Sequence, residues 1–93
     1  MIVGICSFEL YLEWSNSLKD KRREIKSLIS RVRSKFNVSF AEVDCQDEWR
    51  KAVLGIAVIS SERRHIDSVL NEVISFIELE TEAEIISCKI EIL

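Results

Sequence analysis

The segment from Ser17 to Phe36, SLKDKRREIKSLISRVRSKF, has the clearest periodicity in the chain and limits the folds open to it. On a helix with 100° between successive residues, six of its apolar side chains fall within about 100° of one another. They are Leu18, Ile25, Leu28, Ile29, Val32 and Phe36. The pattern predicts an amphipathic helix that covers one face of a larger core, with Ser17 as its N-cap and Asp20 in its first turn.

The same segment holds eight of the thirteen Lys and Arg residues of the chain. Beside the apolar stripe, five cations follow one another around the helix with no acid among them: Lys19, Arg22, Arg23, Lys26 and Arg33. Cations in the first turns of a helix oppose its dipole. We therefore expect them to be compensated, either by acidic loops of the same chain or by an anionic partner.

Length and composition limit the possible architecture of the whole chain. Ninety-three residues with 47% hydrophobic and 31% charged side chains predict a single globular domain, residues 1–93. The absence of proline and the presence of only two glycines exclude a flexible linker and a glycine-rich phosphate loop. The first twelve residues are interrupted by Gly4, Ser7 and Glu9 and lack a basic segment, so we expect neither a signal peptide nor a membrane span, and a cytoplasmic location.

The remaining periodicities predict four strands and a second helix. Strands are expected at Ile2 to about Glu13, Val38 to Cys45, Trp49 to Ser60 and Ile85 to Leu93. The third of these is apolar on both faces, as is typical of a central strand. Ser60 or Ser61 is expected to cap a helix from Glu62 to Phe76 or slightly beyond, which an acidic connection, Glu78 to Glu84, joins to the last strand.

This order, β-α-β-β-α-β, predicts an α+β domain of the ferredoxin-like plan, with a four-stranded antiparallel sheet of order 4-1-3-2 and both helices on one face. In that plan the acidic connection and the turn after Cys45 share an end with the start of the basic helix. The other end is expected to gather Arg31, Arg33 and Lys35 with Arg63, Arg64 and His65.

Three expectations concern single side chains. Cys6 and Cys88 are expected in the core as free thiols on neighbouring strands, because three cysteines without a Cys-x-x-Cys pair fit neither a disulfide framework nor a zinc site. Trp49 is expected to close the hairpin as a core residue. In the last strand the inward positions are Ile86, Cys88, Ile90 and Ile92, and the open sheet face is expected to carry an apolar patch of Val3, Ile5, Tyr11 and Ile85.

The run from Ser17 to Leu70 resembles the YlxP-like family of small uncharacterised bacterial proteins (domain of unknown function 503), and the similarity covers the whole chain. The matching motifs are SLK-x-KR-x-x-[IL]-K-S-[IL] in the basic helix, AEVD at 41–44, the turn at 47–49, LG-x-A at 54–57 and SS-x-R-x-H at 60–65. The resemblance implies the ferredoxin-like fold and no established activity. Members of the family tend to be encoded beside transcription and translation factors, which implies an RNA or ribosome association.

The residues themselves predict a binding protein rather than an enzyme, with no cofactor and no metal. The third strand has no aromatic side chain to stack on RNA bases, and the turn at 14–17 has no cation for a phosphate. Glu42, Asp44 and Asp47 resemble a cluster for a hard metal ion, but carboxylates beside a turn are more often solvated. His65, the one histidine, is expected at the far end from them.

Two hypotheses about partners follow, and neither involves a membrane. The first is an RNA- or ribosome-associated accessory that binds the phosphate backbone through Lys19, Arg22, Arg23, Lys26 and Arg33, helped by Arg63 and Arg64. The alternative is a protein-interaction module that docks an acidic protein on the same helix, or a homodimer through the open sheet face. The local cations favour RNA, whereas the net charge of −3 favours a protein partner.

Overall fold

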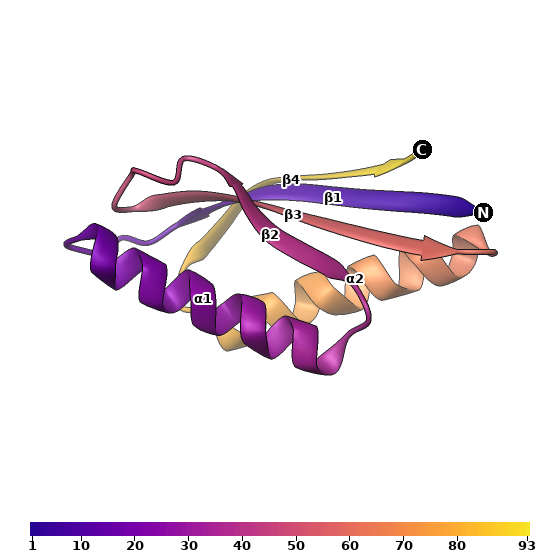
Figure 1. Cartoon of the computed structure of the whole chain (residues 1–93), viewed down its shortest axis with the longest axis horizontal. Coiled ribbons are helices and arrows are strands. Elements are labelled where there is room, and N and C mark those ends of the chain that lie inside the picture. The colour runs from indigo at the N-terminus through magenta and orange to yellow at the C-terminus, as the bar shows by residue number, and fades with distance from the viewer.

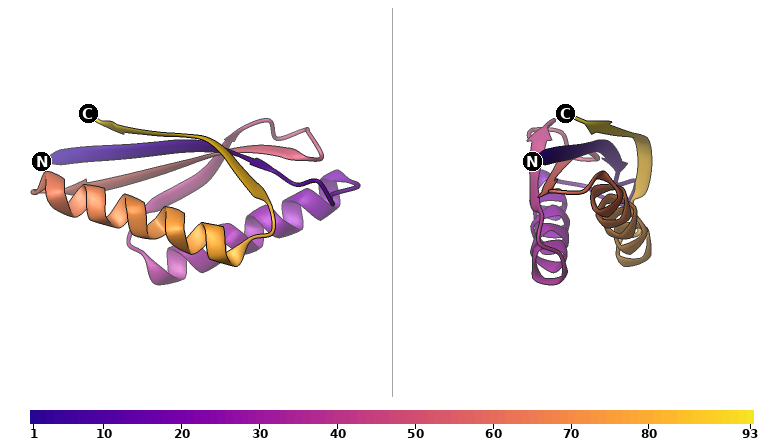
Figure 2. Two further views of the ribbon diagram at one scale, coloured as in Figure 1. Left: turned by 180° about the vertical axis from the view of Figure 1, so that it is seen from behind. Right: turned by 90° about the vertical axis from the view of Figure 1, so that its right-hand side faces the viewer.

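The computed structural model describes residues 1–93, and its elements follow the predicted order (Figure 1). The strands are β1 (Ile2–Tyr11), β2 (Ser39–Asp44), β3 (Lys51–Ser60) and β4 (Glu84–Ile92), and the helices are α1 (Leu18–Lys35) and α2 (Arg63–Glu80). The antiparallel sheet has the order β2-β3-β1-β4, and Figure 2 shows both helices on the same face. The predicted fold, including the 4-1-3-2 order, is confirmed. Neither helix is long and apolar enough to cross a membrane.

The core is a single cluster of sixteen buried hydrophobic residues between the sheet and the helices. From α1 it takes Ile25, Leu28 and Val32, at the spacing that the amphipathic pattern predicts. From α2 it takes Ile66, Leu70, Val73 and Ile77. A Cβ atom on Gly4 of β1 would overlap Cγ2 of Ile66, so α2 can pack this closely on β1 only because position 4 is glycine.

Two predicted boundaries of α2 are wrong. The helix continues to Glu80, whose carbonyl oxygen accepts a hydrogen bond from Nη1 of Arg31 at 3.1 Å, and the acidic connection shrinks accordingly. The expected serine cap is also wrong. Glu62 is the N-cap and makes no side-chain capping bond, while the Ser60 hydroxyl accepts a hydrogen bond from the Glu62 backbone N–H at 3.1 Å. The first strand likewise ends at Tyr11, two residues earlier than expected.

A β-bulge in β4 reverses the side-chain faces predicted for its first half. Ser7 pairs with Lys89 but Glu9 pairs with Ile86, so two residues, Ser87 and Cys88, stand opposite one residue of β1. A slip of one residue turns the side chains to the opposite face. Ile85 therefore lies on the helix side and Ile86 on the open face, the reverse of the prediction.

The helices are antiparallel, and the C-terminal half of α2 lies beside α1: the Thr81 hydroxyl, just after α2, donates a hydrogen bond to Oε1 of Glu24 at 3.2 Å. Phe36, at the end of α1, stacks edge to face on Phe76, with ring centroids 5.6 Å apart. Arg31 lies near Glu80, with Nη1 3.7 Å from Oε1. The N-terminal turn of α2 projects beyond the end of α1, toward the N-terminus of the chain (Figure 1).

Candidate functional site

The five cations Lys19, Arg22, Arg23, Lys26 and Arg33 are all exposed on α1, and we call them the cation band. None of them forms an ion pair within 4 Å. The ion pairs of the chain are Lys21 with Glu42, Arg31 with Glu24 and Glu80, and Lys51 with Glu9. Acidic loops of the chain therefore do not compensate the cation band through ion pairs.

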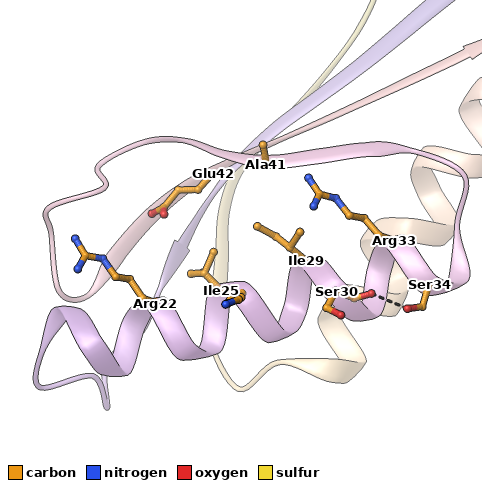
Figure 3. A pocket seen from close by; sticks show the side chains of 9 residues that line it. Arg22, Ile25, Ile29, Ser30, Arg33, Ser34, Ala41 and Glu42 are labelled. Carbon is orange, nitrogen blue, oxygen red and sulfur yellow. Dashed lines mark hydrogen bonds between the residues drawn. The ribbon is translucent and has the colours of Figure 1, made fainter.

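A groove with a volume of about 730 Å³ runs between α1 and β2 (Figure 3). In this view the side chains of Arg22, Ile29 and Arg33 extend from α1 toward β2. This α1–β2 groove has cations along it and an apolar floor. Its lining residues are Arg22, Ile25, Lys26, Ile29, Ser30, Arg33 and Ser34 from α1, and Ala41 and Glu42 from β2. Lys19 and Arg23 belong to the cation band but lie outside the groove.

Arg33 links the cation band to the backbone of β2. Its Nη2 donates a hydrogen bond to the carbonyl oxygen of Phe40 at 2.6 Å. β2 is an edge strand, paired only with β3, so this carbonyl lies on the side of β2 that has no neighbouring strand. The guanidinium thus occupies one hydrogen-bonding position of a free sheet edge.

Lys21 is the polar residue of α1 that the sequence analysis missed. Its side chain is fully buried, and its ammonium donates to the carbonyl oxygens of Cys45 at 2.7 Å, Lys51 at 3.1 Å and Gln46 at 3.3 Å. Nζ also lies 3.0 Å from Oε2 of Glu42. One cation is thus enclosed by four oxygens and joins the first turn of α1 to the β2–β3 turn.

A sequence signal for Lys21 existed. On the helical wheel it falls about 60° from Leu18, between the buried positions Val32 and Leu28, and so inside the apolar stripe. A cation in the middle of an apolar stripe must reach water or find buried acceptors. The uncapped carbonyls of the turn after Asp44 supply those acceptors.

Two of the three carboxylates that resembled a metal cluster have structural partners. Glu42 lies beside Lys21, and Oδ1 of Asp44 accepts a hydrogen bond from the Cys45 N–H at 2.8 Å. Cys45 itself has a φ of 61°, in the left-handed region. Asp47 is exposed on the turn.

The other predicted cations are not gathered into the band. Arg63 and Arg64 are exposed in the first turn of α2, and α1 contacts that helix only through residues such as Phe76, roughly three and a half turns further on. Their expected cluster with Arg31, Arg33 and Lys35 is wrong, because α1 lies beside the C-terminal half of α2 and not beside its first turn. His65 is exposed beside Arg64.

The exposed aromatic side chains, Tyr11, Trp14 and Trp49, lie before α1 and in the β2–β3 turn, at one end of the molecule. Trp49 is 56% exposed, so its expected role in the core is wrong. Trp14 and Tyr11 line a hollow of about 410 Å³ with Glu13, Glu82 and Glu84. Glu82 and Glu84 thus lie near the start of α1, as predicted, whereas Glu80 lies beside Arg31 in the C-terminal half of that helix.

The thiols of Cys6 and Cys88 lie side by side on β1 and β4, with their Sγ atoms 3.4 Å apart. Cys6 is buried, as predicted, but Cys88 is exposed, so its predicted place in the core is wrong. It lies on the edge strand β4, where Ile90, outside the bulge, is exposed as well. Burial, together with the neighbouring Cys88 thiol, raises the pKa of Cys6 to about 12. Cys6 is therefore a protonated core residue at neutral pH rather than a nucleophile.

Comparisons with known proteins agree with this picture of a small domain without an assigned chemistry. Residues 3–90 match the family described as "Protein of unknown function (DUF503)". The uncharacterised protein YlxP of Bacillus subtilis (strain 168) is 37% identical over 83 residues, which cover 89% of this chain and 90% of the relative. Because the match spans nearly the whole chain, the protein belongs to the DUF503 family.

Proposed function

We propose that this protein is a non-catalytic binding protein that holds an acidic partner protein on the cation band and in the α1–β2 groove. The observation that carries the proposal is the combination of Arg22, Lys26 and Arg33, none of them ion-paired, with the apolar side chains of Ile25 and Ile29 in one groove. A polypeptide with acidic and apolar side chains can satisfy both, whereas a phosphate backbone satisfies only the cations.

The overall charge supports the same conclusion. The chain has a net charge of −3 although the segment Lys19 to Lys35 alone carries eight cations and two acids. A surface that is acidic outside one band repels an extended polyanion but accepts a partner that is acidic only locally. We place this activity in the cytoplasm, where thiols such as Cys6 and Cys88 remain reduced.

Structured RNA, with the chain as an RNA- or ribosome-associated accessory, is the second candidate partner. It is favoured by Lys19 and Arg23, which continue the cation band beyond the groove and also lack an ion pair. In that case the phosphate backbone would be bound without reading of sequence. Arg63 and Arg64 would take part only if the RNA spanned both helices.

The test compares two double charge reversals that change the net charge equally. Arg22→Glu/Lys26→Glu removes two groove cations, and Arg63→Glu/Arg64→Glu removes two cations of α2. We expect a glutamate-rich peptide to bind the wild type and the α2 variant and to lose binding to the groove variant, as followed by NMR titration. Neither Arg22 nor Lys26 has an ion pair, so the melting temperature should stay within about 4 °C of the wild type.

An RNA hairpin is the second probe in the same experiment. If it binds through the cation band while the peptide does not bind, RNA is the partner, and log K should then fall with log salt by roughly 0.7 to 0.9 per phosphate contact. If neither probe distinguishes the groove variant from the α2 variant, the cation band is not a binding surface and the proposal is wrong.

A further inference from the structure

We propose that the α1–β2 groove binds an extended acidic peptide as an added strand on the free edge of β2. The inference rests on the proposed function and specifies how the partner is held. The occupant is a short segment of another protein, recognised through its backbone as well as through its side chains.

The first argument is the edge itself. β2 pairs with β3 alone, and the Phe40 carbonyl is turned away from β3 toward Arg33. In a strand the N–H and C=O of one residue point to the same side, and the direction alternates along the chain. The backbone groups of Phe40 and Glu42 therefore face away from β3, toward the groove. A β-bulge follows Glu42, so the regular edge open to an incoming strand ends at this residue.

The second argument is the state of Arg33. In the protein without a peptide, its guanidinium donates a hydrogen bond to the Phe40 carbonyl oxygen, and Phe40 is fully buried. A peptide N–H can replace the guanidinium at that carbonyl, and the released cation then meets a carboxylate of the peptide. The exchange replaces a hydrogen bond from a cation to a neutral carbonyl with one from the same cation to a carboxylate, in which both partners are charged and which can be bidentate. An acidic peptide is thus favoured over a neutral one.

The third argument is spacing. Along α1, with a rise of 1.5 Å per residue, Arg22, Lys26, Ile29 and Arg33 lie at about 0, 6, 10.5 and 16.5 Å. Side chains on one face of an extended peptide recur about every 6.6 Å. Three such side chains placed at about 3, 10 and 16 Å would meet the Arg22–Lys26 pair, then Ile29, and then Arg33. The groove therefore fits an acidic, an apolar and an acidic side chain at alternate positions.

Glu42 does not oppose this occupant. Its carboxylate lies in the groove, but Oε2 is 3.0 Å from the ammonium of buried Lys21, so its charge is compensated within the protein. The net charge presented by the groove is that of Arg22, Lys26 and Arg33.

The experiment uses a capped peptide with the core Glu-Thr-Val-Thr-Glu and the full-length protein. Binding is measured by NMR titration, with the Glu-to-Gln peptide as the control for charge. Two further peptides are N-methylated, one at both Thr amides and the other at the Val and second Glu amides. Only one set of alternate amides of an added strand faces β2, so one methylated peptide should bind at least tenfold more weakly while the other keeps its affinity.

We also expect the amide proton of Glu42 to exchange more slowly in the complex, since an added strand gives it a hydrogen-bond acceptor. Lys26→Glu should weaken binding about tenfold, whereas Arg64→Glu, which makes the same charge change on α2, should not.

The outcomes separate this inference from the proposed function. If the peptide binds through Lys26 but both methylated peptides bind equally well, strand addition is wrong and the proposed function stands. If the peptide does not bind and an RNA hairpin does, both are wrong and the cation band serves nucleic acid. If no probe binds, both are likewise wrong.

Discussion

Lys21 shows how one polar side chain can organise a small domain. An ammonium has three protons, and here it faces three carbonyl oxygens and one carboxylate oxygen with no access to water. The carbonyls of Cys45 and Gln46 belong to the turn between β2 and β3, which has no tight-turn glycine. The buried cation therefore stabilises this turn, as backbone hydrogen bonds stabilise a tighter hairpin.

Replacing this cation should be costly. We expect Lys21→Met to lower the free energy of unfolding by about 3 kcal/mol, because it leaves Glu42 and the turn carbonyls without their partner. Urea denaturation measures the change, and Lys26→Met, on the exposed side of the same helix, should change stability by less than about 0.5 kcal/mol. Equal effects of the two substitutions would show that the buried contacts of Lys21 do not stabilise the fold.

Cys6 predicts a loss of stability at alkaline pH. Its pKa is about 12 in the folded protein and near 9 when it is exposed on unfolding. Between these values the folded state keeps a proton that the unfolded state releases, so stability falls as the pH rises above 9. We expect the melting temperature to decline from pH 9 to 11, and Cys6→Ala to have a lower melting temperature at pH 7 but a shallower decline. A decline of the same slope in both proteins would refute the assignment to Cys6.

At the scale of elements, the bulge decides what β4 contributes. It turns Ile85 toward the helices and Ile86, which is 38% exposed, to the open face. Ser87, within the bulge, has a φ of 56°, in the left-handed region that favours glycine. The second half of the strand keeps the predicted inward positions, since Ile92 pairs with Gly4 and Ile90 with Cys6.

Relief of this strained conformation is testable. We expect Ser87→Gly to stabilise the protein by about 0.5 to 1 kcal/mol, because the cost of a side chain in the left-handed region exceeds the entropy that glycine loses on folding. Chemical denaturation of the two proteins measures the difference. Ser7→Gly, on the neighbouring strand without positive φ, should destabilise instead. A destabilising Ser87→Gly would mean that residue 87 does not hold this conformation in solution.

At the scale of the whole molecule, the two-layer design leaves one sheet face open. The molecule extends 42 × 22 × 16 Å, because α1 and α2 overlap only at one end and cover the sheet from one side. The uncovered face exposes Ile59 by 60% and Val43 by 55%. Between them lies a hollow of about 310 Å³ over Gly55 and Ala57.

We expect this face to support self-association, with apolar burial contributing about 25 cal/mol per Å². Sedimentation analysis should show a dimer whose population grows with concentration, and Ile59→Lys should shift it to monomer. Ser61→Lys, next to the face but outside the sheet, is the control. A protein that remains monomeric at high concentration would exclude the homodimer and leave the α1–β2 groove as the surface for partners.

The order of the elements, the sheet topology and most of the core could be predicted from sequence alone. The reason is local: the periods of Leu18 to Phe36 and of Ala52 to Ile59 each fix which face is buried, and β-α-β-β-α-β admits few arrangements. The cation band was also visible, because helical geometry sets which side chains of one helix are neighbours.

Only the tertiary structure determines the α1–β2 groove, the burial of Lys21 and the sheet face on which Ile86 lies. The groove depends on the gap between α1 and β2, which no single segment encodes. Lys21 lies inside a stripe that the pattern marks as apolar, and only the approach of the β2–β3 turn gives it acceptors. The bulge in β4 depends on pairing with β1. A single inserted residue moves the side chains of half a strand to the other face of the sheet, and the alternation of apolar and polar residues in the sequence does not show it.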